Sequence, residues 1–507
     1  MTETILSRRS FIAASAASGL AGLAPFAPAL AAAGRDWGPD FAAALKKNPM
    51  LVGWKTPPDT LDAKALTITG KWPAALRGRF FRNGPAAHDR FGQRYQHWFD
   101  ADGMIQEFAI DGGKVAHRGR LIQTPKLQRE TKAGKRLYGG FGTDWKDVGP
   151  VNGPDSVNVA NISVLHHGGD LMALWEAGSA ALLDEKSLAF KGYKTWRPDL
   201  KGVAFSAHPK VDPDGTLWSF GYNLLPRPAL VLYHIAASGK IVKAAVVKAG
   251  PMGMIHDFVV TEKSLVIVIP PYHLDPAKAQ SGSFLDAHVW KPNAETRILV
   301  VDKADFDKRR WYALPAGFGF HHGNGWEEKD GTIRFDHCLA PDPSIVTETL
   351  RYVMKGEMRA ASPEKYSQIV LPPKGDAMIL GQAGESEFPK VAPSVVGRRN
   401  RFAYMLAAGA GGDGWQFHKD IKRDLEKGTA DAFTYGNGVI PEEHLFVPKP
   451  GGTGEDDGWL IGTVLDWKKG ITGVSVFDAR AVAAGPVAQA WLPYPLPLGF
   501  HGTFVAA

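Results

Sequence analysis

Cysteine is nearly absent from this sequence, which has Cys338 as its only thiol among 507 residues. One thiol cannot form an intrachain disulfide, and it cannot supply the several thiolates of a cysteine-based metal site. Any metal that the chain binds must therefore be held by histidine and carboxylate side chains.

Long runs of like charge are absent as well. The formal net charge of +7 is spread over short clusters of Lys and Arg and is balanced by 52 acidic residues. Nucleic-acid-binding proteins usually carry a basic stripe or a basic run of about five or six residues. We therefore interpret the charge as an ordinary solvated surface and expect no nucleic-acid partner.

From residue 40 onward, the chain lacks long stretches with a helical period of 3.6 residues. It repeats instead a polar turn followed by about six to eight residues rich in β-branched, aromatic and leucine side chains. Successive repeats start about 45 to 70 residues apart, which is typical of the sheets of a β-propeller. The repeats begin at Gly103, Gly169, Gly215, Lys263, Gly331, Arg401 and Gly458.

This pattern predicts an all-β fold, namely a seven-bladed β-propeller with a helical and loop cap over one end. A pair of β-sandwiches is the alternative, but no Gly/Ser-rich or Pro-rich linker interrupts residues 50–507. Residues 40–507 are accordingly predicted to form a single domain. Residues 416–432 are predicted to form a short helix, and the cap is expected from insertions at residues 223–235, 270–297 and 338–365.

The N-terminal residues 1–33 have the features of an export signal. Arg8 and Arg9 precede an alanine-rich apolar stretch that ends in Ala29, Leu30 and Ala31, a pattern with small residues at both cleavage-site positions. The twin arginine predicts a Tat-type signal peptide, export by the Tat machinery and a periplasmic location. An uncleaved membrane anchor is the alternative, but alanine, glycine and proline dominate the stretch and make a weak spanning helix.

Three of the 16 histidines stand in a regular relation to the repeats. His208 and His256 each lie seven residues before the start of a repeat, and His321 lies ten residues before one. Equivalent positions in successive blades would lie on the innermost strands, so their imidazoles would converge near the axis. Convergent imidazoles without cysteine suit zinc, copper, iron or nickel.

Imidazoles that bind a metal usually donate their other ring N–H to a carboxylate or carbonyl. Glu176, Glu387 and Glu443 each adjoin an apolar stretch and are candidates for this role. Taken singly, each would be interpreted as a surface carboxylate at the end of a strand.

At the level of motifs, the chain resembles the carotenoid cleavage oxygenases, a family that includes polyene-cleaving and stilbene-cleaving enzymes and a retinoid isomerase. The likeness extends from about residue 50 to the C-terminus. It rests on FFRNGP at 80–85, HWFDADGMI at 97–105, FSAHPKVDPDGTLWSFGY at 205–222, MIHDFVVTE at 254–262, FGFHHGNGWEE at 318–328, EFP at 387–389, EEHLFVPKP at 442–450, EDDGWL at 455–460 and LPLGFHGTF at 496–504.

The resemblance implies a seven-bladed propeller with one iron(II), Fe(2+), per chain on its axis. By motif, the iron ligands, which are also the catalytic residues, are His208, His256, His321 and His501. The acids that hydrogen-bond to these ligands are Glu176, Glu387 and Glu443. The resemblance gives no ligand role to His322, which should point to the opposite side of its strand. Nor does it give one to His97, which we interpret as structural.

The sequence departs from the family pattern in places that bear on the substrate. Glu442, Glu443 and His444 stand where Gly-Glu-Pro is usual. Leu121 and Pro154 stand near the positions of the Tyr and Lys with which stilbene-cleaving relatives hold a phenolic hydroxyl. The loss of this Tyr and Lys favours an apolar polyene over a phenolic stilbene as the substrate. Aromatic side chains expected to line the cavity are Phe99, Trp175, Phe320 and Trp326.

The resemblance therefore implies a non-haem iron(II) dioxygenase that cleaves a C=C bond of a carotenoid or apocarotenoid with O2 to give two carbonyl products. Its partners would be a small apolar conjugated substrate, O2 and the Tat machinery, and a peripheral membrane contact for substrate uptake stays open. The alternatives are a stilbene-cleaving (lignostilbene-type) dioxygenase, a same-fold isomerase or isomerohydrolase, a non-catalytic periplasmic carrier of apolar ligands, and a propeller lactonase with calcium and carboxylate ligands.

Overall fold

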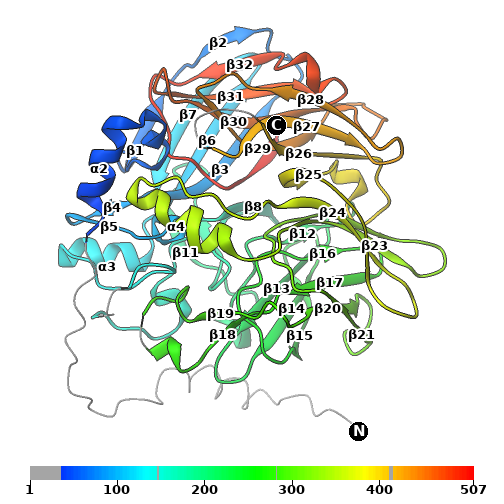
Figure 1. Cartoon of the computed structure of the whole chain (residues 1–507). Helices are drawn as coiled ribbons and strands as arrows, with labels where there is room; N and C mark the ends of the chain where they lie inside the picture. Colours follow the sequence, from blue (N-terminus) through cyan, green and yellow to red (C-terminus); the bar gives the residue numbers. More distant parts are fainter. Residues whose placement is uncertain (1–35, 145–147, 281, 410–414) are drawn as a thin grey trace.

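The computed structural model describes residues 36–144, 148–280, 282–409 and 415–507. The predicted signal peptide, residues 1–33, lies outside the described residues. Antiparallel β-sheets make up most of the regular structure, and short helices lie together on one side of them (Figure 1).

The longest helices of the described chain are short and clearly delimited. They are α2 (Gly38–Lys47) and α3 (Pro125–Ala133). Helix α3 begins where the Thr124 hydroxyl accepts the N–H of Leu127, and it ends at Gly134, which adopts the left-handed conformation. A third helical segment comprises the π-turn η6 (Ile345–Thr349), α4 (Leu350–Tyr352) and η7 (Val353–Lys355), and η7 contacts α2.

Two sheets combine strands from the beginning and the end of the described chain. One has the order β1-β7-β6-β3-β33, with bounds Thr60–Ala63, Lys114–Leu121, Asp102–Asp111, Gly78–Ala87 and His501–Ala506. The other has the order β2-β32-β31-β30-β29, with bounds Thr67–Gly70, Ala488–Trp491, Ile471–Asp478, Gly458–Asp466 and Val439–Pro448. The two ends of this part of the chain are therefore held together by backbone hydrogen bonds.

The sheets between them follow one another in chain order. The first is β11-β10-β9-β8, with bounds Phe190–Tyr193, Ala181–Leu183, Asp170–Leu174 and Ser163–His167. The second is β12-β13-β14-β15, with bounds Lys210–Val211, Leu217–Asn223, Ala229–Ile235 and Ile241–Lys248. The third is β16-β17-β20-β21, with bounds Val259–Val260, Ser264–Ile269, Thr296–Asp302 and Arg309–Leu314.

A seven-stranded sheet runs in order from β22 to β28, and its central strand β25 serves two groups of strands. The N-terminal part of β25 pairs with β24, and its C-terminal part, from Ser386, pairs with β26. The bounds are His322–Glu327, Ile333–Leu339, Lys365–Leu371, Met378–Lys390, Phe402–Ala408, Phe417–Asp424 and Thr429–Thr434. Two small hairpins complete the strands, β18-β19 (Tyr272–Leu274, His288–Trp290) and β4-β5 (Asp89–Arg90, Gln93–Arg94).

Each of the repeats that the sequence predicts contains a strand, and these strands are β6, β9, β13, β17, β23, β26 and β30. They are strongly buried because sheets cover both of their faces: every residue of β17 and β30 is buried. Phe335 of β23, for example, belongs to one apolar cluster with Val266 of β17 and Ile298 of β20. The core is therefore divided into clusters between neighbouring sheets.

The helix predicted at residues 416–432 is wrong, because this segment forms β27 and β28. Its Lys, Arg, Leu and Glu residues favour a helix in isolation, but β27 pairs along its length with the buried strand β26. The charged side chains are accommodated by partners: Lys422 pairs with Asp456 at 2.6 Å and Asp424 with Arg401 at 2.7 Å. Tertiary pairing therefore overrides the local preference.

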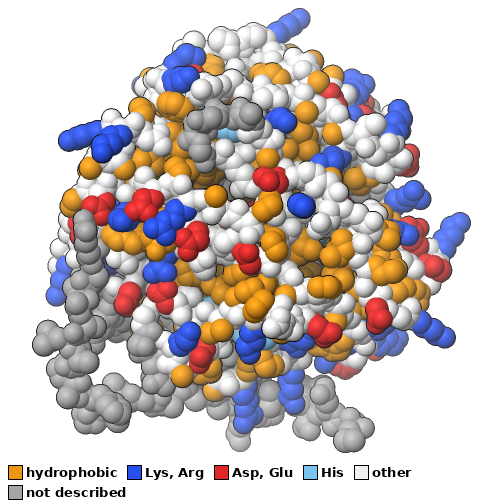
Figure 2. Space-filling view, in the orientation of Figure 1, with side chains coloured by type: hydrophobic (Ala, Val, Ile, Leu, Met, Phe, Trp, Pro, Cys, Tyr) orange, Lys and Arg blue, Asp and Glu red, His pale blue; other side chains and the backbone are white. Residues whose placement is uncertain are grey.

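The described surface mixes both signs of charge. Lys and Arg side chains project around the outline of the face in Figure 2, with acidic side chains among them, and hydrophobic side chains occupy much of its lower half. Among the helices of the described residues, none is long and apolar enough to cross a bilayer.

Candidate metal centre

Four histidines reach one point from four different sheets. His208 stands two residues before β12, His256 three residues before β16, His321 directly before β22, and His501 is the first residue of β33. Strands β12, β16, β22 and β33 are all terminal strands of their sheets. The same kind of position, the start of an edge strand, thus presents each imidazole.

The four rings form a compact cluster, with one nitrogen of each within 4.8 Å of the others. Nε2 of His208 lies 2.9 Å from Nε2 of His256, and Nε2 of His321 lies 3.2 Å from Nε2 of His501. All four side chains are buried. The structure therefore brings together every histidine that the motifs single out.

The three glutamates predicted beside the histidines hold their outer nitrogens. Nδ1 of His256 lies 2.5 Å from Oε2 of Glu176, and Nδ1 of His501 lies 2.7 Å from Oε1 of Glu443. Nδ1 of His321 hydrogen-bonds to Glu387. Because a carboxylate accepts a proton donor, these contacts fix the tautomer with the proton on Nδ1 and a lone pair on Nε2.

The inner lone pairs provide a test of whether the site suits a metal. Lone pairs that face one another at about hydrogen-bond distance repel unless a proton or a cation lies between them. Burial and the neighbouring imidazoles lower the pKa of His208 well below its ordinary value, and burial lowers the pKa of His501 to about 3 despite Glu443. Neither His208 nor His501 therefore supplies a proton at neutral pH, and a set of buried imidazole nitrogens of this kind fits a divalent cation.

One buried carboxylate joins three of the histidine-bearing segments. Asp257 follows His256, its Oδ1 lies 2.7 Å from Nζ of Lys210, and its Oδ2 accepts the backbone N–H of His322 at 3.0 Å. The contacts therefore tie together the segments of His208, His256 and His321. The motif containing Asp257 is visible in the sequence, but this role depends on contacts between distant segments.

The fourth segment, around His501, is held by two adjacent acids. Oε2 of Glu443 accepts the N–H of Gly502 at 3.0 Å, while Oε1 of Glu442 accepts the N–H of Gly499 at 2.6 Å. Burial alone would raise the pKa of Glu443, but Lys390, at 2.8 Å, and His501 hold that pKa well below its ordinary value.

Glu442 has a charged partner of its own. Arg82, in the FFRNGP motif, donates to Oε1 of Glu442 at 2.9 Å. Arg82, Lys390 and Glu442 are contributions that sequence reasoning missed, although the unusual Glu442 was the available signal.

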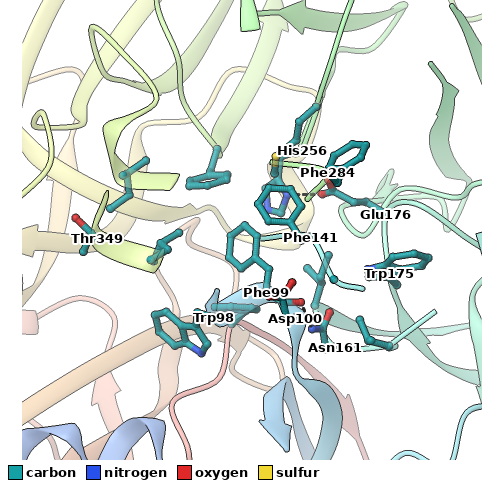
Figure 3. A pocket seen from close by; sticks show the side chains of 18 of the residues that line it. Trp98, Phe99, Asp100, Phe141, Asn161, Trp175, Glu176, His256, Phe284 and Thr349 are labelled. Carbon is teal, nitrogen blue, oxygen red and sulfur yellow. Dashed lines mark hydrogen bonds and ion pairs between the residues drawn. The ribbon is translucent and has the colours of Figure 1, made fainter. Parts of the chain in front are cut away.

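A cavity of about 1040 Å³ opens beside the cluster, and His256, His321 and His501 lie in its wall. Most of the wall is apolar and aromatic. Figure 3 shows Phe99, Phe141 and His256 among the side chains that line the cavity, with a dashed line between His256 and Glu176. The rings of Phe99 and Phe141 pack together with 5.3 Å between centroids. The Phe320 ring packs edge-on against His256 with 5.1 Å between ring centroids. A cavity of this size and polarity suits a long or bulky apolar ligand.

Of the aromatic residues expected in the wall, Phe99, Trp175 and Phe320 line the cavity. Trp326 does not, because it lies farther along β22 and its indole donates to Glu328 at 3.1 Å. Leu121 is also outside the wall and packs against Met104 and Leu127, so its identity carries no information about the substrate. Pro154 does line the cavity.

The three remaining histidines of the motifs, His97, His322 and His444, lie outside the cluster. Nδ1 of His444 lies 2.8 Å from the carbonyl oxygen of Glu442. The ring of His322 stacks on that of His337 at 4.3 Å between centroids. Nε2 of His97 lies 3.0 Å from the carbonyl oxygen of Val346, so His97 joins the 97–105 segment to η6.

Together, the β-rich fold and the site define a class: a candidate metalloprotein with an all-histidine centre at the wall of an apolar cavity. Comparison with known proteins identifies the family. The family model described as retinal pigment epithelial membrane protein (RPE65) matches residues 55–506, and the chain belongs to this family.

Curated relatives resemble the chain over most of its length. It is 28% identical to the apocarotenoid-15,15'-oxygenase of Synechocystis, over 90% of this chain and 95% of the relative. It is 29% identical to the carotenoid 9,10(9',10')-cleavage dioxygenase 1 of Arabidopsis thaliana, over 88% and 87%. It is 26% identical to resveratrol cleavage oxygenase 1 of Aspergillus fumigatus, over 88% and 92%.

The fold is similar to that of a solved relative. The structure of cobalt-substituted Synechocystis apocarotenoid oxygenase superposes with a TM-score of 0.82 at 25% identity, over 90% of this chain and 98% of that one.

Proposed function

We propose that this chain is a non-haem iron(II) dioxygenase that cleaves a C=C bond of a carotenoid or apocarotenoid with O2 and releases two carbonyl products. The observation that carries the proposal is the convergence of His208 with three carboxylate-held imidazoles that lie in the wall of an apolar cavity. The polyene-cleaving activities named for two of the relatives agree with it.

In this proposal His208, His256, His321 and His501 hold the iron, and Glu176, Glu387 and Glu443 orient three of them. Bound iron(II) would supply a centre for oxygen activation that needs no organic cosubstrate. The protein positions the substrate and excludes water. Phe99, Phe141 and Phe320 hold an apolar chain against the histidines and keep bulk water from the reacting carbons.

A stilbene-cleaving dioxygenase is the second candidate, and the relative named resveratrol cleavage oxygenase favours it. The absence of a tyrosine at position 121 no longer speaks against it, since Leu121 lies outside the cavity wall. The size of the cavity favours the longer polyene.

Product analysis separates these functions. Protein purified without a histidine tag and loaded anaerobically with iron(II) would be given apocarotenals or hydroxystilbenes under ¹⁸O2. The proposal predicts O2 consumption and two carbonyl products that each carry one ¹⁸O. Ligand binding without turnover would support a carrier, and an isomerised product without O2 uptake would support an isomerase. Calcium-dependent lactone hydrolysis would support a lactonase. Each of these three outcomes would contradict the proposed dioxygenase function.

We further propose that the sheets form a seven-bladed propeller within a single domain of residues 40–507. Dividing the seven-stranded sheet at β25 gives two four-stranded groups, and the five other large sheets then complete seven units. Pairing of β33 with β3 and of β2 with β32 would close the ring. A crystal structure with sheets arranged openly rather than around one axis would contradict this.

Export by the Tat route to the periplasm is a proposal that rests on residues 1–33. Replacing Arg8 and Arg9 by lysine should leave the protein in the cytoplasm, and fractionation of cells checks this. We also propose a peripheral membrane contact for substrate uptake, because Val151 lines the cavity and is 44% exposed. Vesicle co-sedimentation that is unchanged by Val151→Asp would contradict this contact.

A further inference from the structure

Glu364 is a buried acid in the cavity wall that takes no part in the metal centre described above. Its residue is 2% exposed, and it directly precedes β24. Its carbonyl oxygen accepts the N–H of Ser386 at 2.9 Å, which holds it beside Glu387, the partner of His321. Glu364 therefore lies on the side of the cavity where His321 stands.

The carboxyl group of Glu364 has an unused hydrogen-bonding capacity. Its Oε1 is buried and has no hydrogen-bond partner among the described residues. Three other acids of the same wall are engaged: Glu443 contacts His501, Glu442 contacts Arg82, and Glu385 accepts from Gln416 at 3.4 Å. Glu387 contacts His321 through Oε2, and its Oε1 is buried without a partner like that of Glu364. An unpaired polar group in such a place is costly unless a ligand satisfies it.

The chemical state of this group follows from its surroundings. Burial, and then the negative charge of Glu387, raise the pKa of Glu364 well above its ordinary value. A neutral carboxylic acid has an O–H to donate and a carbonyl oxygen to accept. In a wall that is otherwise mostly apolar, it can hydrogen-bond to a ligand oxygen without competition from a fixed protein partner.

We propose that Glu364 is a specificity-determining residue that hydrogen-bonds to a hydroxyl or carbonyl oxygen of the substrate. The inference rests on the proposed function only in placing the substrate in this cavity. Because Glu364 adjoins Glu387, the bound oxygen lies on the His321 side, near the proposed reaction centre. The substrate class is therefore an oxygenated conjugated molecule, either an apocarotenal or a hydroxylated aromatic alkene, rather than a pure hydrocarbon.

The test uses matched ligands that differ in one oxygen. One pair is 4-hydroxystilbene and stilbene, and the other is an apocarotenal and the hydrocarbon of equal length. Affinity is measured by quenching of tryptophan fluorescence and, separately, kcat/KM by product formation. We expect the wild type to prefer the oxygenated member of one pair by about tenfold, which is the equivalent of one hydrogen bond. The pair that shows this preference identifies the substrate class, an apocarotenal or a hydroxylated aromatic alkene.

The variants assign the preference to the residue. Glu364→Leu should abolish the preference, and Glu364→Gln, which keeps a donor and an acceptor, should retain part of it. Asp336→Asn is the matched control, because Asp336 is also a fully buried acid but lies outside the cavity wall. Metal content and circular dichroism check that each variant is intact.

An unchanged preference in an intact Glu364→Leu protein, or a wild type without preference in either pair, would overturn the inference. If Glu364→Leu fails to fold, Glu364→Gln and the wild-type ligand pairs decide the question. Binding preference without turnover in the wild type would contradict the proposed function while supporting the inference, so the two failures are distinguishable.

Discussion

At the scale of single residues, the partner of the outer nitrogen in three of the four histidines decides what the inner nitrogen can bind. Glu176, Glu387 and Glu443 each hold an Nδ1 atom, so the lone pairs on Nε2 point inward. The acids also bring negative charge next to a site of neutral donors. Their loss should therefore weaken metal binding without destroying the site.

Glu387→Gln tests this point. The amide can still accept from Nδ1 of His321, but the negative charge is lost, so we expect metal affinity to fall by about 10- to 100-fold. The measurement is competition with a chelator, followed by metal analysis. Glu328→Gln is the control, because Glu328 contacts Trp326 outside the cavity wall. Equal affinities in both variants would contradict the contribution of the Glu387 charge to metal binding.

The buried carboxyl group of Asp336 should make the free energy of unfolding depend on pH. Burial raises its pKa to about 7, with Tyr366 and the backbone of Asn324 only partly opposing this. The folded protein therefore holds this proton more tightly than the unfolded chain, and stability falls as the pH rises from about 4 to about 7. Asp336→Asn should remove that part of the dependence.

Urea unfolding of wild type and Asp336→Asn at about pH 5 and pH 8 provides the measurement. The variant should gain stability relative to wild type at the higher pH, where the ionised carboxylate is most unfavourable. A difference between the two proteins that is the same at both pH values would refute the assignment.

At the scale of elements, two short helices end at glycines that differ in how closely other segments pack against them. Gly356 ends η7 with φ of +88°, and an added Cβ would lie 2.3 Å from Cβ of Ala44 in α2. Gly134 ends α3 with φ of +62°, and an added Cβ would meet nothing within 4 Å. The segment with η7 is therefore pressed against α2, whereas the end of α3 is free of such contact.

These two glycines give a matched pair of substitutions. Gly134→Ala should cost about 1 to 2 kcal/mol for the left-handed backbone alone. Gly356→Ala should cost a further 1 to 3 kcal/mol, roughly, because α2 must move away. Thermal or urea unfolding measures both, and equal losses would contradict the close packing. Ligand affinity should also fall in Gly356→Ala, since Ile345 and Leu350 of the same segment line the cavity.

The sequence predicts elements well where pairing and local preference agree. Each predicted repeat contains a strand, because its β-branched and aromatic residues favour a strand and are also buried between neighbouring sheets. Residues 416–432 were predicted wrongly because their charged residues favour a helix, while β26 imposes pairing. Helices α2 and α3 are too short for a period to stand out. The available signals were Pro39 in the first turn of α2 and the N-cap residue Thr124 of α3.

At the scale of the whole molecule, the site could be anticipated only through motifs and the spacing of repeats. Four histidines separated by up to 293 positions, from 208 to 501, meet because each lies at or just before the start of an edge strand of a different sheet. Periodicity alone indicated three of them, and His501 followed from the family resemblance. The contacts of Asp257, Arg82 and Lys390 could not be predicted, because they depend on how distant segments pack.

The claim that one iron(II) is shared by four imidazoles is tested most directly by metal analysis of the tag-free protein after anaerobic loading and removal of loose metal. The account predicts one iron per chain in the wild type, and loss of that iron when His208, His256, His321 or His501 is replaced singly by alanine. His322→Ala, which changes a histidine outside the cluster, should keep its iron. Full iron content in the His208→Ala and His501→Ala proteins would contradict the account.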